Sequence, residues 1–399
     1  MISVKRALSI IKNNANIILE TEIIQSRLSL GRVLAESIRS NNNNPSFNMS
    51  AMDGYAVRNN PKNSIYNVVA ETFAGKPSKK KIFDNEAIRV FTGSKLPDGT
   101  KAVIIQENIK KLENNLIYNT SKKISLGKYI RKIGQDFRKN QKIISKNKRI
   151  NSRDIALLLA ADVKTVKVYK KPKISLLATG DELTVSNGYK KEGSVFASSL
   201  FMLESLIYLA GATCNYKKIV KDNKFQIKDE LIKASKSDII LTTGGVSVGK
   251  KDLIKSSLEE LKFQEKFWKI KMKPGKPLLF GILNKKPIFS LPGNPVSSYV
   301  CFMIFIIPFL YKMLNQKHLV NSKYAILDRS VIPSNDRDSF YRGFHYTRQN
   351  KAYVKVLYDQ DSSLLKTLSN SNCLVEIPKK KSEIKKNASV KIILIPELY

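Results

Sequence analysis

The middle of the chain alternates between short apolar runs and longer segments in which apolar residues recur at helical spacing. Short apolar runs are typical of buried strands, and apolar positions three and four residues apart are typical of helices. The pattern predicts strands over 173–178, 213–220, 238–242 and 287–291, and helices over 195–210, 224–236, 251–262 and 296–314. This alternation indicates a doubly wound α/β domain, a mostly parallel sheet covered by helices on both faces.

The segments on either side follow other patterns. Residues 1–40 have apolar spacing typical of helices, and the asparagine run that ends at Pro45 breaks it. From 46 to about 141 the chain reads as short strands separated by Gly, Pro and Asn turns, which predicts a small inserted β-rich domain. A polar cap before an apolar run predicts a helix over 151–161, and strand patterns over 320–399 suggest a small terminal barrel.

One stretch raises the question of a membrane. Residues 290–311 carry no charge, but the stretch opens with two prolines and a glycine. The apolar helix that follows is therefore expected to be too short for about 30 Å of hydrocarbon, which favours a buried helix over a membrane span. The first residues lack the basic, apolar and small order of a signal peptide, so we expect a cytoplasmic protein.

Composition narrows the classes of function. With 399 residues and 42% hydrophobic content, the chain can bury at least two cores. The three cysteines are scattered, and His318 and His345 do not stand at ligand spacing from them, which disfavours a disulfide framework and a zinc site. A net charge of +37 would normally indicate nucleic acid or an acidic membrane surface. Because the lysines are spread through every region, we interpret the excess as a composition bias on solvated surfaces.

The most informative motif is the segment 238–252, where an apolar strand runs into a glycine-rich turn and then a helix. The hydroxyls of Thr243 and Ser247 and the amides of Gly244 and Gly245 can together surround a phosphate. Similar phrases follow residues 178, 272 and 290. Because ligands of open α/β sheets bind beyond the carboxyl ends of the strands, these turns should converge on one nucleotide or phosphate site. A tight turn without a ligand is the alternative.

Acidic residues beside these turns are candidate magnesium ligands. Asp252 opens the helix after the glycine loop, where the helix dipole stabilises a carboxylate even without a function. Its functional role would be to bind magnesium or a metal-bound water. Asp181 and Glu182 follow the first strand and can serve in the same way, whereas Asp222, after the second strand, is either a ligand or the N-cap of the next helix.

Lysines near the same turns form a candidate anion site. Lys269, Lys271 and Lys273 alternate along a predicted strand and would therefore share one face, and Lys276 follows them. A lysine cluster beside a glycine turn suits a tetrahedral oxyanion and a pyrophosphate. Ordinary solvated surface lysines are the alternative interpretation.

Two phrases of the N-terminal half, 48–57 and 90–99, contain Asp-Gly and Pro-Asp-Gly, which alone predict only turns. With the motifs above they resemble the molybdopterin molybdenumtransferase family, which comprises MoeA and the E domain of gephyrin. The order and spacing match over nearly the whole chain. The phrases that carry the resemblance are Ser50-Ala-Met-Asp-Gly-Tyr-Ala-Val, Phe91-Thr-Gly, Thr179-Gly-Asp-Glu-Leu, Gly244-Gly-Val-Ser-Val-Gly, Lys273-Pro-Gly-Lys-Pro and Leu291-Pro-Gly-Asn-Pro-Val-Ser.

The resemblance implies an activity and an architecture. That family inserts molybdenum from molybdate into adenylylated molybdopterin with Mg2+, and it releases AMP and molybdenum cofactor. It implies an elongated domain from 1–40 and 142–170, an inserted β-rich domain over 41–141, a molybdopterin-binding α/β domain over 171–318 and a C-terminal β-barrel over 319–399. It also implies a homodimer, whose site lies between the α/β domain of one subunit and the inserted domain of the other. Transient contacts with the molybdopterin adenylyltransferase and with apo-molybdoenzymes would follow.

The resemblance also assigns residues by their motif positions. The catalytic set would be Asp53, Asp136, Glu182, Asp222 and Asp252, and all of these except Asp136 would position magnesium and water. The substrate-binding set would be Thr92, Gly93, Thr179, Gly180, Thr243, Gly244, Gly245, Ser247, Lys269, Lys273, Lys276, Pro292, Gly293, Asn294 and Pro295.

Three positions depart from the family pattern. Lys101 stands where the family usually has Asp, Ser199 stands where Asn usually opens a helix, and Lys250-Lys251 makes the end of the glycine loop more basic. Because Ser199 can still cap the helix or accept a hydrogen bond, we expect altered ligand contacts rather than lost activity. The alternatives are a molybdopterin adenylyltransferase, a basic nucleic-acid-binding protein and a scaffold that kept only the fold.

Overall fold

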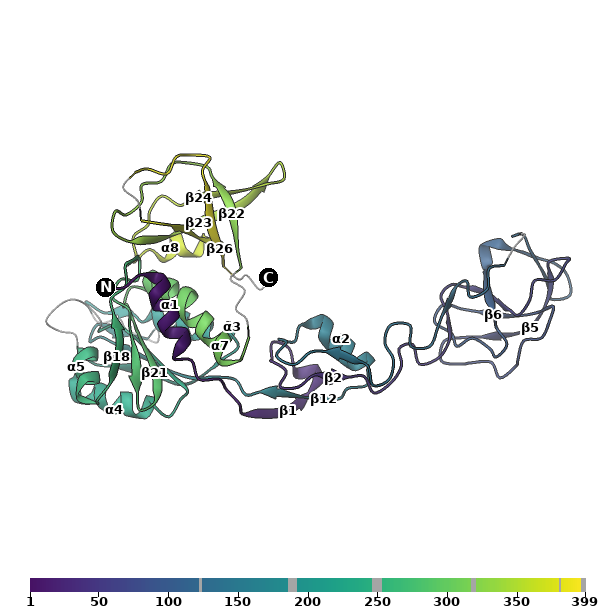
Figure 1. The fold of residues 1–399 in the computed structure, drawn as a ribbon, viewed down its shortest axis with the longest axis horizontal. Helices are drawn as coiled ribbons and strands as arrows, with labels where there is room; N and C mark the ends of the chain where they lie inside the picture. The colour runs from purple at the N-terminus through teal and green to yellow at the C-terminus, as the bar shows by residue number, and fades with distance from the viewer. Residues whose placement is uncertain (122–123, 186–191, 246–252, 317–320, 380–381, 396–399) are drawn as a thin grey trace. The chain divides into compact units, whose positions relative to one another are not determined.

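The computed structural model describes residues 1–121, 124–185, 192–245, 253–316, 321–379 and 382–395. The chain forms two compact units, which are described separately (Figure 1). Unit 1 contains Met1–Glu20 and Tyr169–Tyr399, and unit 2 contains Thr21–Val168.

A six-stranded sheet forms the centre of unit 1, in the order β16-β13-β17-β21-β20-β18. The first four strands are parallel, and β20 and β18 continue the sheet in antiparallel pairing. The strands are β13(Lys173–Thr179), β16(Thr213–Val220), β17(Ile239–Thr243), β18(Gln264–Trp268), β20(Leu279–Leu283) and β21(Lys286–Leu291). This arrangement confirms the predicted, mostly parallel sheet.

Helices cover both faces of this sheet because successive strand residues point to opposite sides. Leu176 and Leu241 pack in a core with one group of helices, and their neighbours Leu177 and Ile240 pack in a second core with the other group. The first group is α1(Val4–Asn13), α3(Ser198–Leu209), α6(Pro295–Cys301) and α7(Ile307–Met313), and the second is α4(Lys224–Ala234) and α5(Leu253–Glu260). The predicted doubly wound fold is confirmed.

The apolar helix has the length that the sequence predicted, and it begins and ends one residue earlier than the predicted range of 296–314. Pro295–Met313 is one helical segment of 19 residues, long enough to cross a membrane by length and composition, but 83% of its most apolar window is buried inside the structure. The expectation that this helix is too short to cross a membrane was wrong, because the helix continues without a break through the π-helical turn η3(Phe302–Ile306) and Pro308. Pro308 has no N–H to donate to Ile304, and a π-helical turn absorbs that missing bond. The segment is a core helix of unit 1, as the sequence predicted.

The C-terminal part of unit 1 is a closed β-barrel. Its strands follow the order β23-β24-β22-β26-β25, and β25 pairs back with β23. The strands are β22(Ser322–Leu327), β23(Asp338–Arg348), β24(Lys351–Val356), β25(Cys373–Ile377) and β26(Ser389–Leu394), and α8(Leu365–Ser369) lies between β24 and β25 in the chain. The short strand β19(Met272–Lys273) pairs with β23. The barrel is thereby joined to the strand that follows β18 in the α/β domain.

Unit 2 contains a six-stranded sheet in the order β7-β4-β6-β5-β9-β8. Its strands are β4(Gly54–Val57), β5(Ile65–Thr72), β6(Glu86–Val90), β7(Ala102–Ile105), β8(Ile109–Lys111) and β9(Leu116–Asn119). These confirm the β-rich inserted region. The rest of unit 2 has α2(Ser152–Ala160) and small sheets formed by β2(Ile38–Arg39) with β11(Lys142–Ile144) and β3(Met49–Ser50) with β10(Ile130–Arg131).

The helical prediction for residues 1–40 holds only for α1. The strand β1(Thr21–Gln25) pairs with β12(Thr165–Tyr169), and residues 26–28 form a single 3-10 turn. Pairing with a segment that lies some 140 positions away along the chain outweighs the local spacing, and the run Thr21-Glu-Ile-Ile favours a strand because Ile and Thr are β-branched.

Candidate active site

The motifs of unit 1 meet at the carboxyl edge of its parallel strands. In the strand register Thr179 pairs with Val220, Ala178 pairs with Thr243, and Thr243 pairs with Leu291. The three turns that follow β13, β17 and β21 therefore start side by side, as the α/β pattern predicted. This common origin turns separate sequence motifs into one candidate site.

The glycine loop approaches the end of β13 so closely that side chains are excluded. A Cβ on Gly244 would lie 2.3 Å from the carbonyl oxygen of Thr179, and one on Gly245 would lie 2.7 Å from the Thr179 hydroxyl oxygen. Both glycines have positive φ, +87° and +63°. The Thr179 side chain is 3% exposed, and its hydroxyl has no hydrogen-bond partner among the described residues. A buried hydroxyl beside two bare backbone segments is a polar position that a ligand oxygen can satisfy.

The Pro292-Gly-Asn-Pro turn is tied to the same strand ends. The Thr243 hydroxyl donates to the Pro292 carbonyl at 3.0 Å, and the Ser298 hydroxyl donates to the same oxygen. Gly293 packs over Gly244, because a Cβ on it would lie 3.5 Å from the Gly244 Cα, and Asn294 and Pro295 begin α6. The turn and the glycine loop form adjacent walls.

Ser199 supports this turn rather than capping its own helix. Its hydroxyl donates to the Gly293 carbonyl at 3.2 Å, whereas Ala197 occupies the N-cap of α3 without a side-chain bond. Neither the expected cap nor the expected acceptor role is found, because the serine lies within the first turn of α3 and faces the other motif.

Three acidic residues follow β13 and β16. The Asp222 N–H donates to the Asp181 carboxylate at 3.1 Å, and the Glu182 carboxylate folds back over Gly180, 2.6 Å from where a Cβ would stand. Gly180 itself donates its N–H to the Val220 carbonyl. The N-cap alternative for Asp222 is wrong, since Asn223 caps α4 by accepting from the Gln226 N–H.

These carboxylates do not form a ready metal cage. Among the described residues, no group of three or more His, Cys, Asp or Glu side chains is arranged to hold an ion. Magnesium commonly takes only one or two carboxylates and completes its shell with water and phosphate oxygens. The exposed carboxylates of Glu182 and Asp222 therefore fit an ion held mainly by substrate and water.

The lysines do not alternate along one strand. β18 ends at Trp268, Lys269 has a left-handed φ of 68°, and strand structure resumes only for Met272 and Lys273. The predicted shared face of Lys269, Lys271 and Lys273 is wrong, because backbone bonds to Ile2 and Leu278 impose a turn at Lys269. Lys273 is the last residue of β19, and Lys276 lies beyond Gly275 in the short connection between β19 and β20.

A loop of the C-terminal barrel, residues 359–363, reaches the same edge and was missed from the sequence. Asn294 donates its side-chain N–H to the Ser362 hydroxyl at 2.7 Å, and the Val296 N–H donates to the Ser362 carbonyl. Hydrogen bonds from Ser363 lower the pKa of Asp361, and the positive charge of Lys273 contributes to the same shift. A polar Asp-Gln-Asp-Ser-Ser run is indistinguishable from any surface turn, so no local pattern predicts this contact.

The buried side chain of Arg342 fixes this loop. It is fully buried, and its guanidinium donates to the carbonyls of Gln360 at 3.1 Å and Asp361 at 2.7 Å. Burial lowers its pKa, although the charges of Asp359 and Asp361 oppose that shift. The arginine thereby holds the loop that lies against the Asn294 turn.

The remaining predicted residues lie in unit 2. The backbone N–H and hydroxyl of Thr92 both donate to one oxygen of Asp53, at 2.7 and 2.8 Å, and these bonds hold the pKa of Asp53 below its ordinary value. Gly93 follows with a positive φ. Asp136 lies in a different loop, where its carboxylate accepts from the Asn44 side chain at 3.0 Å. Lys101 is exposed at the start of β7. Ser247, Lys250, Lys251 and Asp252 lie outside the described residues.

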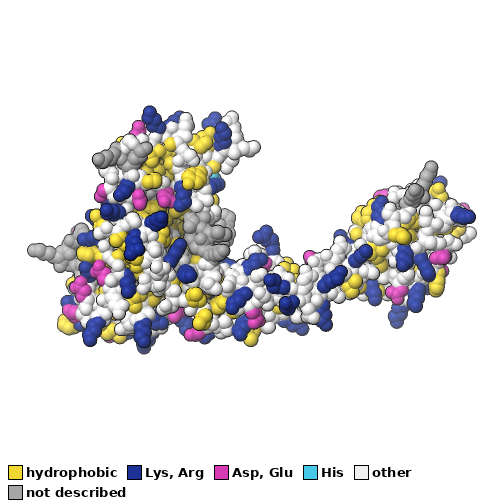
Figure 2. Space-filling view, in the orientation of Figure 1, with side chains coloured by type: hydrophobic (Ala, Val, Ile, Leu, Met, Phe, Trp, Pro, Cys, Tyr) yellow, Lys and Arg dark blue, Asp and Glu magenta, His cyan; other side chains and the backbone are white. Residues whose placement is uncertain are grey.

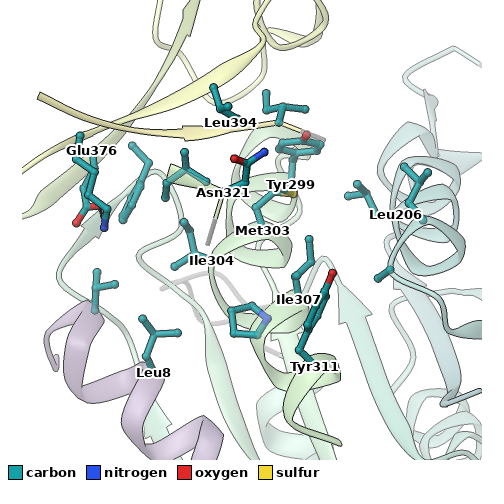
Figure 3. Close-up of a pocket in the computed structure, with 18 of the residues that line it drawn as sticks. Leu8, Leu206, Tyr299, Met303, Ile304, Ile307, Tyr311, Asn321, Glu376 and Leu394 are labelled. Carbon is teal, nitrogen blue, oxygen red and sulfur yellow. Dashed lines mark ion pairs between the residues drawn. The ribbon is translucent and has the colours of Figure 1, made fainter. Parts of the chain in front are cut away.

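Two cavities of unit 1 lie away from these motifs. One, of about 490 Å³, is lined mainly by apolar side chains, with Leu8, Leu206, Ile304 and Ile307 facing it (Figure 3). The other, of about 560 Å³, is bordered by lysines such as Lys236, at the amino ends of β13 and β21. The first is not lined by the phosphate-binding turns, and the second is at the opposite edge of the sheet. The chemistry is therefore assigned to the carboxyl edge, where those turns lie.

Family comparisons cover nearly the whole chain. Residues 2–161 match "MoeA N-terminal region (domain I and II)", 175–312 match "Probable molybdopterin binding domain", and 324–395 match "MoeA C-terminal region (domain IV)".

Individual relatives agree. The chain is 32% identical to a molybdopterin molybdenumtransferase of Haemophilus influenzae, over 94% of this chain and 93% of that protein. It is 31% identical to gephyrin of Dictyostelium discoideum, over 99% of this chain and 62% of that protein. A crystal structure of the molybdopterin biosynthesis MoeA protein of Pyrococcus horikoshii superposes with a TM-score of 0.83 at 28% identity, covering 99% of this chain and all of that one. With the turns that its own strands bring together, these likenesses establish that the chain belongs to the MoeA family.

Proposed function

We propose that this protein is a molybdopterin molybdenumtransferase. Its substrates would be adenylylated molybdopterin and molybdate, and its products AMP and molybdenum cofactor. Support comes from the family membership and from one local observation, the buried Thr179 hydroxyl beside Gly244 and Gly245, which has no hydrogen-bond partner in the described part of the chain. A phosphate oxygen at this position would satisfy the hydroxyl, and the glycines leave backbone free to approach it.

The charges at the carboxyl edge fit both substrates. Molybdate and the pyrophosphate of adenylylated molybdopterin are anions, and Lys269, Lys273 and Lys276 would neutralise them. When two thiols displace one molybdate oxygen, two Mo–S bonds form, one Mo–O bond breaks, and the oxygen leaves with both thiol protons as water. Separately, a water molecule cleaves the phosphoanhydride and AMP departs. Lysine ammonium groups would stabilise the charge that develops on these leaving oxygens.

The acidic residues would serve the phosphates rather than act as nucleophiles. Glu182, Asp222 and Asp252 would hold Mg2+ and its water, and Asp53 would complete the set from unit 2. Magnesium would supply charge for the leaving phosphate. Asp136 would act in the same inserted region, as the family resemblance implies.

The architecture of the family supports further proposals. We propose the four domains given above, and a homodimer that brings Asp53 and Thr92 of one subunit to the strand ends of the other. A cytoplasmic location, and transient contacts with the adenylyltransferase and with apo-molybdoenzymes, complete the proposal. Light scattering of the purified protein tests the proposed dimer. A monomeric mass at micromolar concentration would contradict it.

The decisive experiment is reconstitution. Purified protein, adenylylated molybdopterin, molybdate and Mg2+ should give AMP and active cofactor, and omission of molybdate or addition of EDTA should reduce the yield. Asp252→Asn should stay folded and lose molybdenum insertion. Asp229→Asn, an exposed carboxylate on α4, is the matched control. Full activity of the Asp252 variant would remove its role, and AMP formation only from ATP would favour the adenylyltransferase alternative.

The face of the molecule that Figure 2 shows does not support the nucleic-acid alternative. Lysine and arginine side chains are scattered over the visible faces of both units (Figure 2). A protein that binds nucleic acid through charge usually gathers them into one stripe or patch. A DNA shift assay at several salt concentrations tests it, and tight binding at physiological salt would revive this alternative.

A further inference from the structure

Trp268 is the only tryptophan of the chain and the last residue of β18. Two ammonium groups lie over its ring, that of Lys269 at 3.7 Å from the ring centroid and that of Lys255 at 3.8 Å. Other lysine–aromatic contacts between described residues place a single ammonium group 4.7 Å or farther from the ring. A cation is attracted to the face of an indole more strongly than to that of Tyr or Phe. Trp268 is therefore unusual among the aromatic residues of the structure.

The backbone at Lys269 is held in a left-handed conformation that a lysine rarely adopts. Its φ is 68°, its N–H donates to the Leu278 carbonyl at 3.0 Å, and its carbonyl accepts from the Ile2 N–H at 3.2 Å. Residues kept in sparsely populated backbone regions persist where their surroundings impose them, and they cluster at functional sites. This turn, rather than strand alternation, decides where the Lys269 side chain goes.

The second cation connects the indole to the glycine loop. Lys255 belongs to the first turn of α5, the helix that follows the loop, and its ammonium group pairs with Glu265 at 3.4 Å. The indole thus bridges α5 and Lys269. Its Nε1 is buried without a partner among the described residues, so the ring is held by packing and by the two cations rather than by its own hydrogen bond.

We propose that Trp268 is a positioning residue, whose ring keeps the Lys269 ammonium at the carboxyl edge while that ammonium also contacts a phosphate of the substrate. This rests on the proposed role of Lys269 as an anion ligand. A lysine side chain otherwise samples many rotamers, and fixing it before binding reduces the entropy lost on binding. Because the ring contact acts on binding and not on the reacting atoms, its removal should raise KM and leave kcat nearly unchanged.

Kinetics of two ring variants test the proposal. Trp268→Leu, which removes the π face, should raise KM for adenylylated molybdopterin about tenfold, and Trp268→Phe, which keeps a weaker face, should raise it only about threefold. Both should change kcat less than threefold. A general packing defect would instead lower kcat and thermal midpoint in both variants. Equal KM values for wild type and both variants would overturn the proposal.

The emission of this single tryptophan gives a direct readout in the full-length protein. Inorganic pyrophosphate bound to the Lys269 ammonium should change the emission of Trp268, because it partly neutralises the positive charge that lies against the indole. Lys269→Met should abolish this response, whereas Lys266→Met, an exposed lysine on the same strand, should keep it. A pyrophosphate response that persists unchanged in Lys269→Met overturns the proposal.

The outcomes separate this inference from the function on which it rests. If Lys269→Met keeps full molybdenum insertion, the proposed anion role of Lys269 fails. If Lys269→Met loses activity while Trp268→Leu keeps the wild-type KM, only the positioning role of Trp268 fails.

Discussion

Gly244 offers the sharpest test of the site geometry. An alanine Cβ at this position would lie 2.3 Å from the Thr179 carbonyl oxygen, and ordinary contact begins at 3.4 Å. Relief requires a displacement of about 1 Å between the ends of β13 and β17, which pair at Ala178 and Thr243. The backbone also has a φ of +87°, which L side chains disfavour. Gly244→Ala should therefore strain the turn in two separable ways.

The free-energy costs of the positive φ and of the steric contact can be estimated separately. A left-handed conformation costs a non-glycine residue about 1–2 kcal/mol. Forcing an extra methyl group into a packed contact costs about 1–3 kcal/mol more. The free energy of unfolding should thus fall by about 2–5 kcal/mol. A misplacement of about 1 Å at a reacting centre can lower the reaction rate about 100-fold. The rate of AMP release should therefore fall by about the same factor.

A matched glycine separates the two effects. Gly193, also in unit 1, has a φ of +77°, and a Cβ there meets nothing within 4 Å. Gly193→Ala should lose only about 1–2 kcal/mol and keep its activity. Urea unfolding followed by Trp268 emission reports on unit 1, and AMP release reports on the site. If the two variants lose equal stability and Gly244→Ala keeps wild-type turnover, the close approach of Gly244 to Thr179 has no effect on the site, and the reasoning is refuted.

Three further predictions concern other contacts. Arg342→Leu should lower the stability of unit 1 by about 3 kcal/mol in urea unfolding and raise KM, because the carbonyls of Gln360 and Asp361 lose a charged donor. Arg348→Leu, exposed on the same strand, should do neither. Thr92→Val removes the hydroxyl that donates to Asp53 and should therefore raise the pKa of Asp53. If the reaction needs an ionised Asp53, the acidic limb of the pH–activity profile should move to higher pH. An acidic limb at the wild-type pH would contradict this role of Asp53. Burial raises the pKa of the Cys301 thiol, and it raises the pKa of Cys373 to about 12. A disulfide reagent at pH 8 should therefore label neither thiol before unfolding, and rapid labelling of either one in the native protein would contradict this burial.

The α/β domain could be predicted from its sequence because its signals are local. Buried strands leave continuous apolar runs, and the predicted strand 238–242 and helix 224–236 differ from β17 and α4 by one or two residues. The turns after β13, β17 and β21 were also predictable, since parallel strands put their carboxyl ends on one edge. The shared origin of the candidate site therefore followed from pattern and topology alone.

The errors come from contacts between distant parts of the chain. Lys269 is not in the predicted strand because its carbonyl accepts a hydrogen bond from the Ile2 N–H. Residues 21–25 form β1 instead of the predicted helix because they pair with β12. The loop at 359–363 joins the site through contacts with Arg342, Asn294 and Val296, all of which lie 17 or more positions away in the sequence. No local pattern encodes such partners. In unit 2, Asp53 lies beside Thr92. The residue types in these two phrases predicted only turns and did not predict this contact.

The first helix completes a domain that the rest of the chain supplies much later. Ala7 and Ile11 of α1 are buried in the core with Phe309 and Ile393, and the Ile18 N–H donates to the Met313 carbonyl. During synthesis from the amino end, Thr21–Val168 emerges whole before most of that core exists. Unit 2 can then fold first, while α1 stays exposed to solvent until the rest of its core has been synthesised. Ribosome-bound chains halted before residue 300 should expose this segment to proteases, and completed chains should protect it.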